Sequence, residues 1–197
     1  MYLSKIFVNW RWTRDPYQLH RALWQLFPDR ADMSRDFLFR LEELHTGKGG
    51  VVLLQSMLSP CDAIVAQVVA SKPLGFRLEK NARLRFRLRA NPVKTIKDAQ
   101  RRQNSRGEVK SCRVPLIDEG EQTAWLQRKL SGIAVLEQCR ITQEKALFFQ
   151  KNNRNGKIQP VCFDGFLTVS DTDKFNQILI QGIGPAKAMG CGLLSIA

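Results

Sequence analysis

The chain has 197 residues, 44% of them hydrophobic, which is enough for one large domain or two small ones with packed cores. Lysine and arginine number 31 against 18 acidic residues, so the net charge of +13 favours a polyanionic partner. No apolar run approaches the roughly 18 residues of a membrane span and no signal peptide begins the sequence, so we expect a cytoplasmic protein with no membrane partner.

The first 80 residues predict a strand, a helix, two strands, a second helix and a fourth strand. Asp15 and Pro16 are typical of the start of a helix, and the leucines that follow share one face of it. The order of elements is that of a ferredoxin-like domain. The expected strands cover 3–10, 35–44, 49–58 and 74–79, and the helices cover 13–27 and 60–70.

Residues 81–197 partly repeat this order. A helix is expected over 119–130, and another over 171–182 with Asp171 or Thr172 as its cap. Asn155-Gly156 predicts a type I′ turn in a hairpin over 145–169. Further strands are expected over 82–96, 131–142 and 191–196. The fold class predicted is α+β, with two tandem ferredoxin-like βαββαβ domains at residues 1–80 and 81–197.

Most of the excess charge lies between Lys72 and Arg113, where 14 basic residues accompany three acidic ones. This segment alone therefore carries +11 of the total +13. Such a localised field is typical of nucleic-acid binding, because neutralising phosphates releases their counterions. A face that served only solubility would more often mix the two signs.

Arginine alternates with apolar residues over 83–90. In a strand this pattern turns four arginines to one face and leaves Leu84, Phe86 and Leu88 for the core. We expect the row to bind phosphates, with pairing to neighbouring acids as the alternative for some members. The contacts predicted from this strand are Arg85, Arg87 and Arg89.

Further basic residues occupy the polar segment after this strand and the tip of the hairpin. Basic loops of this kind often become ordered when they bind RNA. The RNA contacts predicted here are Lys94, Lys97, Arg101, Arg102, Arg106, Lys110, Arg113, Arg154 and Lys157.

The segment "GIGPAKAMGCG" places four glycines and Lys187 directly before the last predicted strand. A dinucleotide-binding fingerprint is excluded, because that motif opens a strand–helix–strand unit of about 30 residues. We expect a loop whose backbone amides and Lys187 approach phosphates, and the alternative is a plain link into the last strand. The residues concerned are Gly182, Gly184, Lys187, Gly190 and Gly192.

The chain has two histidines, and only His20 shares a helix face with another reactive side chain, that of Tyr17. Both residues lie in the first turns of a helix, whose N-terminus favours phosphate. Near neutral pH, His20 can take a proton from a hydroxyl or give one to a leaving oxygen. With RNA bound, the 2′-OH would attack its own phosphate and leave a 2′,3′-cyclic phosphate and a 5′-OH. The alternative is a histidine that only contacts RNA.

No metal or cofactor is expected. The five cysteines never stand in C-x-x-C spacing, which argues against a zinc site and a disulfide framework and favours ordinary thiols. No cluster of carboxylates indicates a two-metal centre, which favours a metal-free route.

Several segments together carry a family resemblance. They are "MYLSK", "YQLHRALWQLFP", "RDFLFR", "FRLRANPVKTI", "KSCRVPL", "AWLQRKL", "GKIQPVCFDG" and "GIGPAKAMGCGLLS". With these segments the chain closely resembles the CRISPR-associated CasE endoribonucleases of type I-E systems, along essentially its whole length.

The resemblance implies two RRM-like domains that bind the stem-loop of a CRISPR repeat RNA. It implies metal-free cleavage on the 3′ side of the stem, with the product kept inside the bacterial Cascade complex beside other subunits. Catalysis would fall to His20 with Tyr17, in acid and base roles that the sequence leaves open. The alternatives are a non-catalytic RNA-hairpin-binding protein and a binder of duplex DNA, for which no helix-turn-helix or zinc motif is present.

Overall fold

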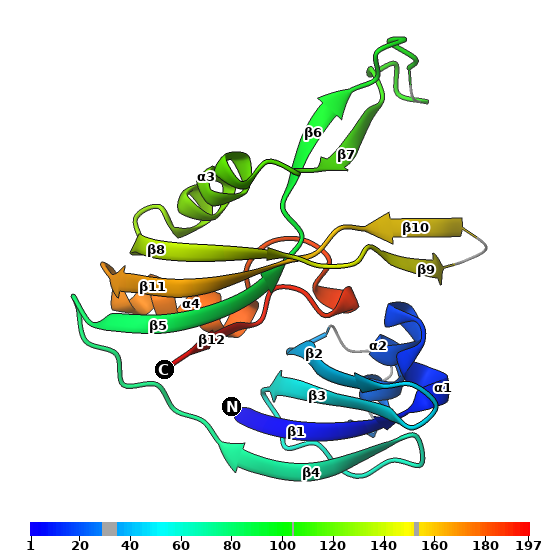
Figure 1. The fold of residues 1–197 in the computed structure, drawn as a ribbon, viewed down its shortest axis with the longest axis vertical. Coiled ribbons are helices and arrows are strands. Elements are labelled where there is room, and N and C mark those ends of the chain that lie inside the picture. Colours follow the sequence, from blue (N-terminus) through cyan, green and yellow to red (C-terminus); the bar gives the residue numbers. More distant parts are fainter. Residues whose placement is uncertain (29–34, 104, 152–153) are drawn as a thin grey trace.

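A computed structural model describes residues 1–28, 35–103, 105–151 and 154–197, with only the backbone of Lys151 and Arg154 included. Two four-stranded antiparallel sheets lie one above the other, and a long ribbon projects from the upper one (Figure 1). Each sheet has its own hydrophobic core. No helix in the described ranges is long and apolar enough to cross a membrane.

The first sheet has the strand order β2-β3-β1-β4. Its elements are β1 (Tyr2–Asn9), α1 (Trp10–Thr13), α2 (Pro16–Trp24), β2 (Phe37–His45), β3 (Gly49–Ser56) and β4 (Ala66–Pro73). The side chain of Asp15 caps α2, as its sequence predicts. Leu19 and Leu23 of α2 are buried in the same core as Phe39 and Leu54 of the sheet.

Two predictions for this half are wrong. Residues 60–70 form no helix: Ala66 begins β4, which pairs with the free edge of β1, as in Ile6 with Val68. β-branched residues favour a strand in a sheet over a helix. Residues 74–79 form no strand, because Phe76 and Leu78 instead pack against the second core.

The second sheet has the order β12-β5-β11-β8. Its elements are β5 (Arg83–Ala90), α3 (Glu119–Leu130), β8 (Ala134–Gln143), β11 (Val161–Val169), α4 (Thr172–Gln181) and β12 (Leu194–Ile196). In both sheets the first strand lies between the third and the fourth, so the α+β fold of two ferredoxin-like repeats is confirmed, except that the described residues 57–65 form no helix between β3 and β4 of the first repeat. Asp171 caps α4.

Two ribbons are added to the second repeat. They pair β6 (Val93–Lys97) with β7 (Ser111–Pro115) and β9 (Leu147–Lys151) with β10 (Arg154–Ile158). The single strand predicted over 82–96 is therefore wrong. It breaks at Asn91 and Pro92, because proline lacks a ladder donor and restricts the residue before it.

The turn predicted at Asn155-Gly156 is also wrong. Gly156 lies inside β10 opposite Phe149, and the connection falls on 152–153, outside the described residues. A Cβ atom on Gly156 would lie 2.7 Å from Cε1 of Phe149, so the glycine makes room for the ring. The residue is needed for cross-strand packing rather than for a turn.

The segment between α4 and β12, which we call the glycine loop (residues 182–193), joins the two halves of the molecule. Its 3-10 helix η1 (Lys187–Met189) packs against α2 and β2. Gly182 has φ +74° and ψ 167°, a conformation that essentially only glycine adopts. A Cβ atom there would lie 2.8 Å from the carbonyl oxygen of Gly192 and 2.9 Å from Leu38 of β2. The loop thus presses backbone against the first sheet.

The variant Gly182→Ala is expected to lower the free energy of unfolding by about 4 kcal/mol, through backbone strain and overlap. The matched control is Gly132→Ala, where φ is +69° and a Cβ would meet nothing within 4 Å. That control costs only about 1 kcal/mol. Chemical denaturation measures both values, and equal losses would show that the loop does not press on β2.

Candidate active site and nucleic-acid interface

Tyr17 and His20 lie together on α2, and both are partly exposed. The carboxylate of Asp15 holds the start of this helix through one oxygen, which accepts bonds from the amides of Tyr17 (2.7 Å) and Gln18 (3.1 Å). Its other oxygen accepts a bond of 3.3 Å from the amide of Gln150 on β9. One side chain therefore fixes the helix and ties it to the ribbon of the second repeat.

The imidazole of His20 rests among aromatic rings. Ring centroids lie 5.7 Å away for Phe37 and 6.4 Å away for Phe39. The indole Nε1 of Trp24 donates a bond of 3.2 Å to Nε2 of His20. Because indole N–H only donates, this bond forms with the neutral tautomer of the ring that has its proton on Nδ1. The arrangement holds a proton-transfer group in one orientation.

A groove opens beside this helix, where the glycine loop meets the two ribbons. Its volume is about 860 Å³, and η1, which packs against α2, forms one wall. The charged residues that line it, as far as the structure describes them, are all basic: Arg35, Arg113, Lys157 and Lys187. An anion is the natural occupant of such a groove.

The arginine row of β5 is largely neutralised within the protein. Arg83 pairs with Glu137 at 2.6 Å and Arg87 with Asp164 at 2.7 Å. The bond to Asp164 is also the main reason that the pKa of Arg87 is raised. The exposed Arg85 forms no ion pair among the described residues. The sequence leaves open whether these arginines pair with neighbouring acids. In the structure most of the arginines of the row do so.

Arg89 does not reach the surface. It is 8% exposed, pairs with Glu144 at 2.7 Å, and its Nη1 lies 3.5 Å from the carbonyl oxygen of Gly190. Although burial alone would lower the pKa of Arg89, the bond to Glu144 and nearby charges leave it raised. This arginine supports the glycine loop from beneath, and we leave it out of the proposed RNA contacts.

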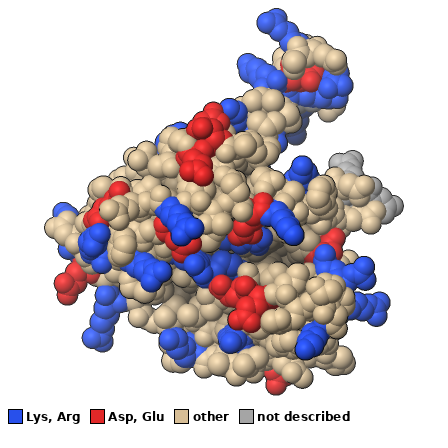
Figure 2. Space-filling model, in the orientation of Figure 1, with Lys and Arg blue, Asp and Glu red and all other residues tan. Residues whose placement is uncertain are grey.

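The β6–β7 ribbon carries the most exposed charge. Figure 2 shows Lys and Arg gathered over this ribbon at the top of the view. Lys94 pairs with Glu121 of α3 at 2.8 Å, and Arg102 pairs with Asp98 at 2.8 Å. The other predicted contacts of the ribbon are exposed: Lys97, Arg101, Arg106, Lys110 and Arg113.

Some residues of the glycine loop are buried in the protein, and others line the groove. Gly190 and Gly192 are buried, and the amide of Gly192 donates to the carbonyl of Arg89 at 2.7 Å. Gly184 and Lys187 line the groove, and the ammonium of Lys187 donates to the carbonyl of Gln181 at 2.6 Å. Burial, then the charges of Arg35 and Lys129, lower the pKa of Lys187. Only part of the loop therefore faces a ligand.

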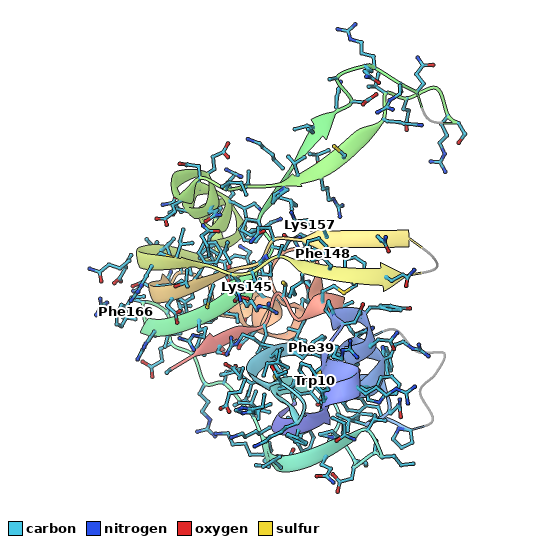
Figure 3. All side chains as sticks on the ribbon, turned by 45° about the vertical axis from the view of Figure 1, so that its right-hand side comes forward. Trp10, Phe39, Lys145, Phe148, Lys157 and Phe166 are labelled. Carbon is cyan, nitrogen blue, oxygen red and sulfur yellow. The ribbon has the colours of Figure 1, made fainter. Side chains whose placement is uncertain are left out.

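The sequence predictions missed three residues. Arg35 and Asn91 line the groove, and Phe148 is 67% exposed on β9 with the ammonium of Lys157 5.6 Å from its ring centroid (Figure 3). The correct hairpin register pairs Lys157 with Phe148 and would have revealed that contact. The side chain of Arg154, a predicted contact at the start of β10, lies outside the described residues.

Cys162 and Cys191 lie in surroundings that disfavour the thiolate. Burial raises the pKa of both Cys162 and Cys191 to about 12, so neither is a thiolate at neutral pH. In the described ranges no group of three or more His, Cys, Asp or Glu residues is placed to hold a metal ion.

Comparison with known proteins identifies the family. The model of the CRISPR associated protein family matches residues 1–197. The chain belongs to this family. It is 52% identical over 197 residues to the CRISPR system Cascade subunit CasE of Escherichia coli K12, covering 100% of this chain and 99% of that one.

Two further matches extend the likeness. The chain is 34% identical to the CRISPR-associated endoribonuclease Cse3 of Thermus thermophilus, with 100% of each chain covered. A solved structure of the endoribonuclease Cse3 bound to a 19-nucleotide RNA has a TM-score of 0.79, at 33% identity and 100% coverage of both chains. The family fold therefore extends over all of this chain.

The variant Trp24→Phe is expected to keep the ring packing but remove the donor to His20. The Nδ1–H form of neutral His20 should then lose about 1 kcal/mol of preference, a population change of about fivefold. The nitrogen chemical shifts of the imidazole, measured by NMR above neutral pH, report the populations of the Nδ1–H and Nε2–H forms. Trp10→Phe, on the neighbouring helix α1, is the control and should leave the spectrum unchanged; an unaltered spectrum in Trp24→Phe would exclude the bond.

Proposed function

We propose that this protein is an endoribonuclease that binds the repeat stem-loop of precursor CRISPR RNA and cuts it on the 3′ side of the stem. The mature guide RNA then stays bound within a Cascade complex. The observation that carries this proposal is the placement of Tyr17 and His20 on α2, against a loop that lines a groove whose described charged residues are all basic. The names of the matched relatives, a Cascade subunit and an endoribonuclease, support it.

The reaction needs only the RNA and this chain's own side chains. The ribose 2′-oxygen forms a bond to its neighbouring phosphorus while the bond from phosphorus to the 5′-oxygen breaks. One proton leaves the 2′-OH and one reaches the 5′-oxygen, and His20 carries out one of these transfers. Tyr17 or a nearby cation stabilises the charge that builds on the phosphate oxygens. The products are a 2′,3′-cyclic phosphate and a 5′-OH.

Recognition of the stem rests on its shape and phosphates. Exposed cations of the β6–β7 ribbon, the β9–β10 ribbon and the groove supply these contacts, and Phe148 offers a ring on which a base can stack. The proposed contacts are Arg85, Arg87, Lys94, Lys97, Arg101, Arg102, Arg106, Lys110, Arg113, Arg154, Lys157, Gly182, Gly184 and Lys187. Gly190 and Gly192, which are buried, act through the shape of the loop.

A guide-RNA complex of this kind works where its precursor is transcribed. We therefore expect the protein in the bacterial cytoplasm, bound to other Cascade subunits. A protein that keeps its product completes about one cleavage per molecule, whereas steady multiple turnover would contradict product retention.

Removing the imidazole is expected to separate cleavage from binding. With RNA that carries the repeat hairpin, His20→Ala should cut about 10²- to 10⁴-fold more slowly in single-turnover assays and bind with unchanged affinity. His45→Ala is the matched control, because that exposed histidine pairs only with Glu43 in the described contacts. Wild-type cleavage should persist in excess EDTA.

Each part of this proposal can fail separately. RNA that is bound but never cut by the wild type would make the chain a binding protein without activity. Cleavage that stops in EDTA would require a metal, and equal competition by a DNA repeat would remove the argument for RNA.

Charge removal on the β6–β7 ribbon is expected to depend on existing ion pairs. Lys97→Gln should reduce the salt slope of hairpin affinity by about 1, because a phosphate contact is lost. Lys94→Gln should reduce it less, since Lys94 already pairs with Glu121. Binding titrations at several salt concentrations measure both slopes, and equal slopes in all three proteins would remove this ribbon from the interface.

A further inference from the structure

Two polar atoms in the groove have no hydrogen-bond partner among the residues that the structure describes. Nη1 of Arg35 and Oδ1 of Asn91 are both buried and unsatisfied, and both residues line the groove. Asn91 as a whole is only 6% exposed. Buried polar groups in folded proteins are nearly always paired with protein, water or a ligand, so these two atoms can pair with a ligand that enters the groove.

The two atoms require different chemistry from that ligand. Arg35 can only donate, and its guanidinium suits phosphate oxygens. Oδ1 of Asn91 can only accept, so the ligand must also present an N–H or O–H group. A phosphodiester group has no O–H and cannot satisfy both atoms by itself, whereas a nucleotide can, through its phosphate and through a sugar hydroxyl or a base N–H.

The charges agree with an anion at this place. Burial alone lowers the pKa of Arg35, and the nearby Arg35 charge contributes to the lowered pKa of Lys187. Like charges that repel each other in a partly buried site are relieved when an anion enters between them. No acidic residue stands among the described groove residues to do this from within the protein.

The size and the apolar surface also fit. The volume of about 860 Å³ lies within the range of roughly 300–1,000 Å³ that is usual for small-ligand sites. Phe149 and Met189 contribute apolar walls, against which a base can rest. Lys187 and Met189 of η1 line the groove, and η1 packs against α2, so the groove adjoins the helix that carries His20.

We propose that this groove holds one unpaired nucleotide next to the RNA stem, with its phosphate on Arg35 and Lys187 and a sugar or base donor on Asn91. This inference rests on the proposed function, because it takes RNA as the ligand. It adds a subsite in which Arg35 and Asn91 position the strand beside the reacting linkage. Neither residue takes part in the bond changes.

The test compares two RNAs by binding alone. Both contain the repeat hairpin with a 2′-deoxy sugar at the cleaved linkage, and only one carries unpaired nucleotides beside the stem. Arg35→Gln should weaken binding of the flanked hairpin about tenfold, and Asn91→Ala about fivefold. Neither variant should change binding of the bare hairpin by more than about twofold. Arg83→Gln, an arginine paired with Glu137 on the sheet, is the control and should affect both RNAs alike.

The RNA group that donates a hydrogen bond to Oδ1 of Asn91 can then be identified. Each unpaired nucleotide is replaced in turn by its 2′-deoxy form or by an abasic sugar, and bound to the wild type and to Asn91→Ala. The substitution that abolishes the difference between the two proteins marks the partner of Oδ1, as hydroxyl or as base. If no substitution at any position does so, the assignment of Asn91 is wrong.

A purely structural role for Arg35 predicts a different pattern. Among the described residues the Nη1 atom of Arg35 has no partner, and the positive charge of Arg35 repels that of Lys187. If Arg35 serves the subsite, Arg35→Gln should therefore leave the melting temperature of the free protein unchanged or raise it. A lowered melting temperature, or equal loss of binding for both RNAs, would overturn the subsite. Because cleavage is never measured, a failed cleavage assay and a failed subsite remain distinguishable.

Discussion

The close approach of the glycine loop to the first sheet is the contact on which the rest of the structure depends. Gly182 brings backbone so close to Leu38 that a Cβ atom would overlap it at 2.9 Å, and Gly190 approaches Phe39 so closely that a Cβ would lie 3.1 Å from its ring. Nearby, the side-chain amide of Gln55 donates to the carbonyl of Leu179 at 2.6 Å, which further joins β3 to α4. These contacts set the helix of the first repeat against the groove of the second, so neither repeat forms the site alone.

The two repeats supply different parts of the proposed chemistry. The first contributes an imidazole, held by Trp24 and by a wall of phenylalanine rings. The second contributes most of the cations, on strands and ribbons that project toward solvent. A rigid reacting group beside an adaptable charged surface suits an enzyme that recognises shape, since the surface can follow the stem while the reacting group keeps its orientation.

The sequence predicts what depends on local chemistry and misses what depends on packing. Asp15 before Pro16 predicts the cap, and the alternation over 83–90 predicts which side chains enter the core. The valines of β4 predict a helix because the need of β1 for a partner strand is not visible locally. Asn155-Gly156 predicts a turn because only the fold places Phe149 against Gly156. The roles of Arg35 and Asn91 were missed for the same reason, since the groove joins segments far apart in the chain.

The net charge of +13 overstates the field that a ligand meets, and its distribution matters more than its size. On β5, carboxylates of β8 and β11 neutralise Arg83 and Arg87, so that face presents alternating signs. In the groove no described acid balances Arg35 or Lys187. The paired face can meet any polyanion weakly, whereas the unbalanced groove gains most from one phosphate placed between its cations. Specific retention of a product should therefore depend on the groove, and general attraction of RNA on the ribbons around it.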